Sequence, residues 1–349
     1  MRIVLTGATS FIGRAVLNEL LAGGHQVFAV VRPGSPGMEA LEQTAKARGL
    51  LAREQETRGP LAQGQKARGP LAREQETRSP LAPATSASLK ILPCPLSDIH
   101  AVIAHPALAG GADAWMHLGW EGGGSANRAD ETVQRRNIGY ALESLRTAAA
   151  LGCRRFCFSG SQAEYGICDG PMHEELACRP VSEYGKDKLK VCEQALELAK
   201  ELGITYIHTR IFSVYGPGDH PWSLVETCLD AFLSGGHIDL GTCTQQWNFM
   251  YVTDAARALA ELLLGNAESG VYNVAGEDTR PLSSYIEELH RLCGGGGTFA
   301  YGKRPPNAEG VVSLRPETGK LKAAVGWRCR VDFETGIRTM IDMRKMNRR

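Results

Sequence analysis

Short apolar runs alternate with longer amphipathic segments through most of this chain. Residues 2–6 form an apolar run that ends at a glycine, and residues 11–22 repeat apolar side chains at helical spacing. A second apolar run follows at residues 25–31. This strand–turn–helix–strand order predicts a βαβ unit and therefore a parallel sheet.

The same alternation resumes after residue 88. It predicts strands at 89–94, 112–118, 154–159, 204–211 and 250–252, helices at 132–151, 182–203 and 254–264, and a loop at 272–276. Strands and helices that alternate over this length predict an α/β fold with a doubly wound parallel sheet, the Rossmann architecture. The C-terminal quarter is richer in glycine and proline, which favours a smaller substrate-binding domain.

We therefore predict a dinucleotide-binding domain over residues 1–212 and a substrate-binding domain over 213–349, with about 248–264 returning to the first. A decapeptide repeat interrupts the first domain at about 36–88, with the units LEQTAKARGL, LAREQETRGP, LAQGQKARGP and LAREQETRSP. The units carry no aromatic residue with which to build a core. We interpret them as a tandem duplication in a surface loop that can form short helical turns, with a lid or partner-binding role as the alternative.

Composition excludes several classes of protein. A formal net charge of +1 gives no reason to expect binding to nucleic acid or to an anionic membrane. No apolar run approaches the roughly 18 residues that span a bilayer, and the N-terminus does not resemble a signal peptide. We expect a cytoplasmic protein whose ten cysteines are reduced. Their spacing does not match a zinc site, so we expect no metal.

The turn after the first apolar run has the spacing of a dinucleotide-binding site. Its glycines permit a tight turn and close helix–strand packing, and the helix start offers backbone N–H groups to a pyrophosphate. A serine replaces the middle glycine, and its hydroxyl can face a phosphate. The predicted cofactor-binding residues in this turn are Gly7, Thr9, Ser10, Phe11, Ile12 and Gly13.

The end of the second predicted strand bears on which dinucleotide binds. Arg32 stands here, and there is no acidic residue to accept hydrogen bonds from the ribose of NAD. An arginine can pair with the additional 2′-phosphate of NADP. We predict NADP as the preferred cofactor and keep NAD as the alternative, in which Arg32 faces solvent.

Tyr184 and Lys188 lie four residues apart on a predicted helix, so their side chains share one face. A tyrosine with a pKa of about 10 is a poor base at neutral pH, and a neighbouring ammonium favours the phenolate. Ser161, near the end of a predicted strand, is placed to polarise a reacting carbonyl or hydroxyl. We predict these three as catalytic residues, with Lys188 also holding the nicotinamide ribose beside Tyr184.

The order of these motifs resembles the extended short-chain dehydrogenase/reductase family, specifically its NAD-dependent epimerase/dehydratase branch. The likeness runs from residue 1 to about 340 and is carried by the segments 158–166, 210–219, 248–254, 272–276 and 314–337. The resemblance implies that the cofactor site also includes Leu118, Gly119, Asn137 and Ile211. It implies a homodimer in which the predicted helices 132–151 and 182–203 pair across a two-fold axis.

The resemblance also implies a nucleotide-sugar substrate. Its expected contacts are Gln162, Ser213, Trp247 and Arg315, with the Arg315 guanidinium as the diphosphate clamp. In the 4,6-dehydratases of the family an Asp-Glu pair follows the catalytic serine or threonine, whereas Gln162 and Ala163 follow Ser161 here. Glu164 is one position late and faces the opposite way along a strand. A dehydratase is therefore not expected.

The segment Ser-Gln-Ala-Glu-Tyr-Gly from residue 161, together with Trp247, is most similar to the 4-ketoreductases of the CDP-3,6-dideoxyhexose synthase type. We therefore expect an NAD(P)-dependent oxidoreductase that acts at C4 of a nucleotide-activated hexose, as a 4-ketoreductase. A C4-epimerase with tightly bound NAD is one alternative. A non-catalytic sensor or scaffold that binds the dinucleotide is another.

Overall fold

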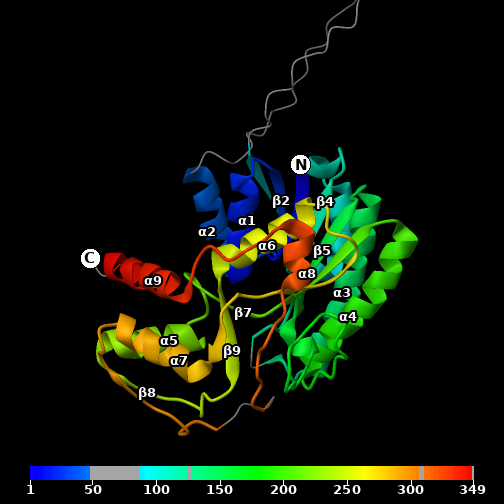
Figure 1. Ribbon diagram of the computed structural model, residues 1–349. Helices are drawn as coiled ribbons and strands as arrows, with labels where there is room; N and C mark the ends of the chain where they lie inside the picture. The colour runs from blue at the N-terminus through cyan, green and yellow to red at the C-terminus, as the bar shows by residue number, and fades with distance from the viewer. Residues whose placement is uncertain (48–86, 125–126, 306–309, 348–349) are drawn as a thin grey trace, which may run out of the picture.

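A seven-stranded sheet lies at the centre of the molecule. The computed structural model describes residues 1–47, 87–124, 127–305 and 310–347 (Figure 1). The strand order is β10-β6-β5-β4-β1-β2-β3, and every neighbouring pair is parallel. The strands are β1 Arg2–Thr6, β2 Gln26–Val31, β3 Ser88–Pro93, β4 Ala114–His117, β5 Arg155–Ser161, β6 Thr205–Ile211 and β10 Gly270–Val274. This order confirms the predicted doubly wound α/β fold.

Helices cover both faces of this sheet (Figure 1). Along β1, Ile3 and Leu5 pack in one core cluster and Val4 in the other, because successive side chains point to opposite faces. Both clusters exclude solvent, which explains why the strands are almost continuously apolar. One face carries α1 Phe11–Ala22, α2 Pro36–Ala47 and α6 Val252–Leu264; the other carries α3 Glu131–Ala150, α4 Glu183–Leu202 and the 3₁₀ segments Leu96–Ala104 and Pro106–Leu108.

Polar residues set the ends of the helices that carry the site. The Ser10 hydroxyl accepts a hydrogen bond from the Gly13 N–H at the start of α1, and Ser182 accepts one from the Gly185 N–H at the start of α4. Gly203 ends α4 in the left-handed conformation with a φ of 68°. These local signals explain why the sequence predicts both helices to within about a residue at each end.

A smaller C-terminal region packs below the carboxyl ends of the central strands (Figure 1). Its core is aromatic, with Phe333 in ring contact with Tyr215, Phe249 and Tyr285. Its strands are β7 Ser213–Tyr215, β9 Gln246–Tyr251 and β11 Thr279–Pro281 in one sheet, and β8 His237–Asp239 and β12 Thr298–Ala300 in another. Its helices are α5 Leu224–Ser234, α7 Leu282–Leu292, α8 Gly319–Val325 and α9 Phe333–Asn347.

Two local predictions are wrong. The segment expected to be a loop at 272–276 mostly belongs to β10, which completes the central sheet beside β6. The second concerns the segment from residue 36, which was interpreted as a surface loop but begins with α2. Leu41, the first residue of the repeat, and Ala45 are buried in the core of the sheet domain. The remaining repeat units, residues 48–86, lie outside the described residues. No helix within the described part of the chain is both long and apolar enough to cross a membrane.

Candidate active site

The glycine turn between β1 and α1 leaves no room for side chains at its two glycines. Gly7 has a φ of 75°, and a Cβ there would lie 2.7 Å from the Leu118 backbone carbon. A Cβ on Gly13 would lie 1.9 Å from the Gly7 carbonyl oxygen. The backbone of the turn is therefore held against the end of β4, at residues 118 and 119, which the sequence also assigned to the cofactor site.

The Ser10 hydroxyl forms hydrogen bonds with the backbone of the turn itself. Its hydroxyl donates to the Gly7 carbonyl at 2.8 Å and accepts from the Gly13 N–H at 3.1 Å, so its role here is to cap α1. The backbone N–H groups of Phe11 and Ile12 have no partner among the described residues, as expected for the first turn of a helix. These N–H groups and the positive end of the helix dipole fit a pyrophosphate.

Arg32 follows β2 and is exposed to solvent. No acidic side chain in the described ranges pairs with its guanidinium. Beside it, the Thr9 and Ser35 hydroxyls lie 3.4 Å apart, so the chain after β2 lies next to the glycine turn. This places Arg32 at the same edge of the sheet as the turn, as the sequence predicts.

Asn137 on α3 fixes the loop that follows β4. Its side-chain oxygen accepts from the Glu121 N–H at 2.7 Å, and its amide donates to the Glu121 carbonyl at 3.0 Å. The Thr6 hydroxyl accepts from the Gly119 N–H at 3.2 Å. Asn137, predicted as a cofactor contact, thus holds the backbone beside the cofactor turn in this structure. Ile211, also predicted to contact the cofactor, is buried at the end of β6.

Two of the predicted catalytic residues, Tyr184 and Lys188, lie on α4 beside the end of β5, and the third, Ser161, is the last residue of β5. The Lys188 ammonium donates to the Ser159 carbonyl at 2.5 Å, two residues before Ser161. It lies 5.6 Å from the centre of the Tyr184 ring, on the same face of α4. Ser161 is buried, and its hydroxyl accepts from the Ala163 N–H at 3.2 Å. The structure thus brings Lys188 next to Tyr184 and next to the strand that carries Ser161.

Lys188 is buried among aromatic rings. Its ammonium lies 3.8 Å from the centre of the Trp120 ring and 4.6 Å from that of Phe158. Burial lowers the pKa of Lys188 to about 7; the Glu164 carboxylate opposes this fall and Arg128 adds to it. A lysine with such a pKa changes its charge near neutrality, which suits a group that works with Tyr184 in proton transfer.

A cavity of about 1020 Å³ opens beside these residues. Gln162, Ser213 and Trp247, three of the four predicted substrate contacts, line it. It approaches the catalytic residues through Gln162, which follows Ser161, and through Arg128, whose guanidinium carbon lies 4.6 Å from the centre of the Tyr184 ring. The cavity is large enough for a sugar nucleotide.

Arg315, the predicted diphosphate clamp, does not line this cavity. It is exposed and borders a separate depression with Gln246 and Glu317. Gln246 and Trp247 are neighbours on β9 and point to opposite sides of it, because side chains alternate along a strand. Arg315 lies on the same side of β9 as the Gln246 side chain. The residue before it, Leu314, donates its backbone N–H to the Gln246 carbonyl.

Three other cations line the cavity, and the sequence analysis missed them. They are Arg128, Lys303 and Arg304, and no carboxylate belongs to the described lining. The adjacent pair at 303 and 304, just after Gly302, was a signal that could have been noticed. The Trp247 indole nitrogen and the Gln245 side-chain oxygen are buried without a partner among the described residues. The described lining of the cavity is therefore positively charged.

Comparison with known proteins identifies the family of the chain. The model of the NAD dependent epimerase/dehydratase family matches residues 3–275. The dTDP-glucose 4,6-dehydratase of Streptomyces niveus is 26% identical over 237 residues, which cover 63% of this chain and 69% of that protein. The dTDP-6-deoxy-L-talose 4-dehydrogenase (NAD(+)) of Aggregatibacter actinomycetemcomitans is 22% identical over 294 residues, covering 83% and 89%.

Solved structures share the fold over the whole chain. The UDP-glucose 4-epimerase of Thermotoga maritima, solved with UDP-glucose, has a TM-score of 0.78 and 19% identity and covers 100% of both chains. The UDP-glucose 4-epimerase of Thermus thermophilus, solved with NAD, has a TM-score of 0.75 and 19% identity and covers 98% of each chain. The family match over residues 3–275, supported by the dehydratase and dehydrogenase relatives, shows that the chain is an enzyme of the NAD dependent epimerase/dehydratase family.

Proposed function

We propose that this enzyme reduces a ketone at C4 of a nucleotide-activated hexose with a nicotinamide dinucleotide. The observation that carries the proposal is the cavity itself. It adjoins the catalytic residues and is lined by Arg128, Lys303 and Arg304 without a carboxylate in its described lining. Guanidinium and ammonium groups bind phosphate oxygens through charge-assisted hydrogen bonds, so this lining suits the diphosphate of a sugar nucleotide.

The roles of the residues follow from their positions. A dinucleotide held by its pyrophosphate at the glycine turn would supply the hydride from its nicotinamide ring. Tyr184 donates the proton to the sugar oxygen, and Ser161 hydrogen-bonds that oxygen as charge develops on it. Lys188, beside the Tyr184 ring, stabilises the phenolate that remains after the proton has left.

Reduction is favoured over dehydration by the residues that follow Ser161. Gln162 lines the cavity but cannot exchange a proton as a carboxylate does, and Ala163 has no functional group. Glu164 is fully buried and bonded to other side chains, so it does not face the substrate. The relative from Streptomyces is named as a dehydratase, yet no carboxylate stands at either of the two positions after Ser161.

A C4-epimerase is the second candidate, because solved structures with this fold include 4-epimerases with bound NAD. An epimerase would use Tyr184 and Ser161 twice, in oxidation and in re-reduction. A sensor that only binds the dinucleotide would not need a proton donor, so the complete catalytic set argues against that class.

The preference for NADP over NAD rests on Arg32. The family is named for NAD, and nothing beyond the exposed guanidinium at the end of β2 supports NADP. We propose NADP as the preferred cofactor only on that ground. The homodimer also stays a proposal; it would bury the outer faces of α3 and α4, which pack against each other on one face of the sheet, and light scattering of the purified protein tests it.

The test is a panel of UDP-, dTDP-, GDP- and CDP-linked 4-keto sugars mixed with enzyme and NADPH or NADH. We expect stoichiometric oxidation of the reduced cofactor with one of these sugars. Interconversion of C4 epimers without net cofactor oxidation would replace the reductase with an epimerase. No turnover of any sugar nucleotide in either direction, with the dinucleotide still bound, would favour the sensor.

The Tyr184→Phe variant tests the mechanism. It removes only the hydroxyl that donates the proton, so we expect turnover to fall by about 10²- to 10⁴-fold while cofactor affinity stays unchanged. Turnover comes from the panel assay and affinity from calorimetry. Turnover equal to that of the wild type would disprove the role of Tyr184.

A further inference from the structure

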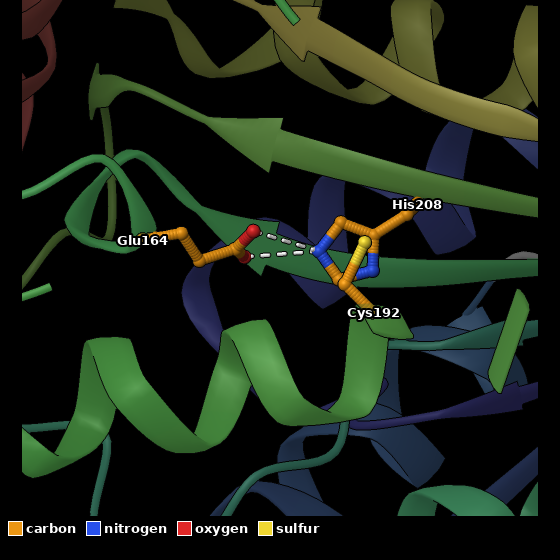
Figure 2. A group of neighbouring side chains, drawn as sticks. All are labelled: Glu164, Cys192 and His208. Atoms are coloured by element: carbon orange, nitrogen blue, oxygen red, sulfur yellow. Dashed lines mark hydrogen bonds and ion pairs between the residues drawn. The ribbon is translucent and has the colours of Figure 1, made fainter. Parts of the chain in front are cut away.

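A group of buried ionisable side chains lies behind the catalytic strand, away from the cavity. Glu164, Cys192 and His208 come from the turn after β5, from α4 and from β6, and they converge on one point (Figure 2). Glu164 and His208 are completely buried, and Arg210 is nearly so. Burying charge is costly unless each charge is paired, so such a group needs a reason to be there.

The Glu164 carboxylate is fully bonded. One oxygen accepts from the Ser161 backbone N–H at 2.8 Å and from His208 Nε2 at 2.9 Å. The other accepts from Arg210 Nε at 2.9 Å and lies 3.1 Å from His208 Nε2 (Figure 2). Nδ1 of His208 lies 3.1 Å from the Tyr206 hydroxyl, so both ring nitrogens have a partner.

The charges of this group are fixed by one another. Burial alone would raise the pKa of Glu164, but His208, Arg210 and the Ser161 N–H outweigh it and lower that pKa. Burial alone would lower the pKa of His208, but the Glu164 carboxylate outweighs it and raises the pKa to about 9. At neutral pH the group therefore contains one carboxylate and two cations.

The last residues of β5 are bound from two directions. Lys188 binds the carbonyl of Ser159, and Glu164 binds the N–H of Ser161. Gly160 lies between them, and a Cβ there would come within 2.3 Å of His208 Nε2 and 2.6 Å of the Glu164 oxygen. The absence of a side chain at 160 is what lets the buried group approach the strand.

We propose that Glu164, held by His208 and Arg210, is a positioning residue that fixes Ser161 through its backbone N–H. This inference rests on the catalytic role given above to Ser161. Ser161 and Glu164 also close the turn after β5 reciprocally, because the Ser161 hydroxyl accepts from the Ala163 N–H while the Glu164 carboxylate accepts from the Ser161 N–H.

A metal site is the competing interpretation, since the ligand atoms of Glu164, Cys192 and His208 lie within 4.8 Å of one another. The hydrogen bonds argue against it. Both Glu164 oxygens are already engaged by N–H donors, one of them on Arg210, so a divalent cation would stand beside a guanidinium in a buried site.

The experiment follows the backbone amide of Ser161 by ¹H–¹⁵N NMR of serine-labelled protein, with its signal assigned from Ser161→Ala. In Glu164→Gln, which keeps the shape and an acceptor but removes the charge, we expect the Ser161 amide proton to exchange with solvent about 10-fold faster or more relative to the other amides of β5, because a charge-assisted hydrogen bond becomes a neutral one. In Cys192→Ser, the matched control, we expect the wild-type exchange rate. An unchanged relative rate in Glu164→Gln would overturn the proposal.

Two measurements on the wild-type protein cover the case in which Glu164→Gln does not fold. The ¹⁵N shifts of the His208 ring should show both nitrogens protonated at pH 7, and a neutral ring would overturn the proposal. Titration with Zn²⁺ should show no stoichiometric binding that Cys192→Ser abolishes; such binding would establish the metal site instead. None of these readouts uses a sugar nucleotide, so they stand whether or not the proposed ketoreductase activity is found.

Discussion

The glycine turn draws its residues from one continuous stretch, 6–13, whereas the large cavity draws its lining from segments between Arg128 and Val312. In the turn, the contacts that shape the backbone join residues a few positions apart, as when Ser10 caps the N–H of Gly13, although the turn also packs against residues 118 and 119. In the cavity, Gln162 and Trp247 are brought together only by the packing of the two regions. Local spacing therefore accounts for much of the predicted cofactor turn, while only tertiary structure assembles the cavity.

If the turn is locally specified, one added methyl group should break it. In Gly13→Ala the new Cβ would lie 1.9 Å from the Gly7 carbonyl oxygen, so the turn must shift. We expect NAD and NADP to bind on the order of 100-fold more weakly, measured by calorimetry.

The control is Gly139→Ala on α3, where the Cβ would meet nothing within 4 Å. We expect that variant to bind normally and to gain about 0.5–1 kcal/mol in free energy of unfolding, because alanine favours a helix over glycine. Normal cofactor affinity in Gly13→Ala would contradict the steric argument.

Nucleotide binding in the cavity should depend on residues that were not predicted from the sequence. We expect Arg304→Ala to weaken the binding of UDP, dTDP or CDP to the cofactor-loaded enzyme by about 10-fold or more, because a charge-assisted bond to phosphate is lost. Arg315→Ala, the matched removal of a guanidinium outside the cavity, should leave that affinity unchanged. If Arg315→Ala weakened nucleotide binding and Arg304→Ala did not, Arg315 would be the residue that binds the diphosphate.

Arg32 gives the smallest expected effect, since it is exposed to solvent. In Arg32→Ala we expect NADP to bind up to about 10-fold more weakly and NAD to be unaffected. The ratio of the two dissociation constants at low and high salt is the measurement. Equal losses for both dinucleotides would mean that the guanidinium does not contact a 2′-phosphate.

Most of the α/β fold could be predicted from local patterns. The bounds of β1 and α1 agree with the sequence prediction, and Tyr184 and Lys188 lie beside each other as helical spacing requires. Gly270–Val274 was not recognised as a strand, because Gly270 and Asn273 interrupt its apolar run and the strand is completed by pairing with β6. Only short helical turns were expected in the insertion, and not the helix 36–47, because charged residues and the start of the repeat obscure the buried Leu41 and Ala45.

The candidate site also contains residues that local patterns predict and residues that only the folded structure brings together. Ser161, Tyr184 and Lys188 could be found because two are fixed by helical periodicity and one ends a strand. Arg315 was predicted from the resemblance, and Arg304 was missed because it lies in a segment without periodicity, where only the course of the chain shows which arginine lines the cavity. The Glu164–His208 contact joins residues 44 positions apart on separate elements, which no local pattern reveals.

The missing side chain at Gly160 has a consequence for how such sequences can diverge. Because a Cβ there would collide with His208 and Glu164, position 160 cannot gain a side chain while both of those residues remain in place. Related sequences that carry a side chain at this position should therefore have a smaller residue in place of the histidine or the glutamate. Position 160 would then serve as a marker that separates lineages with the buried charges from those without them.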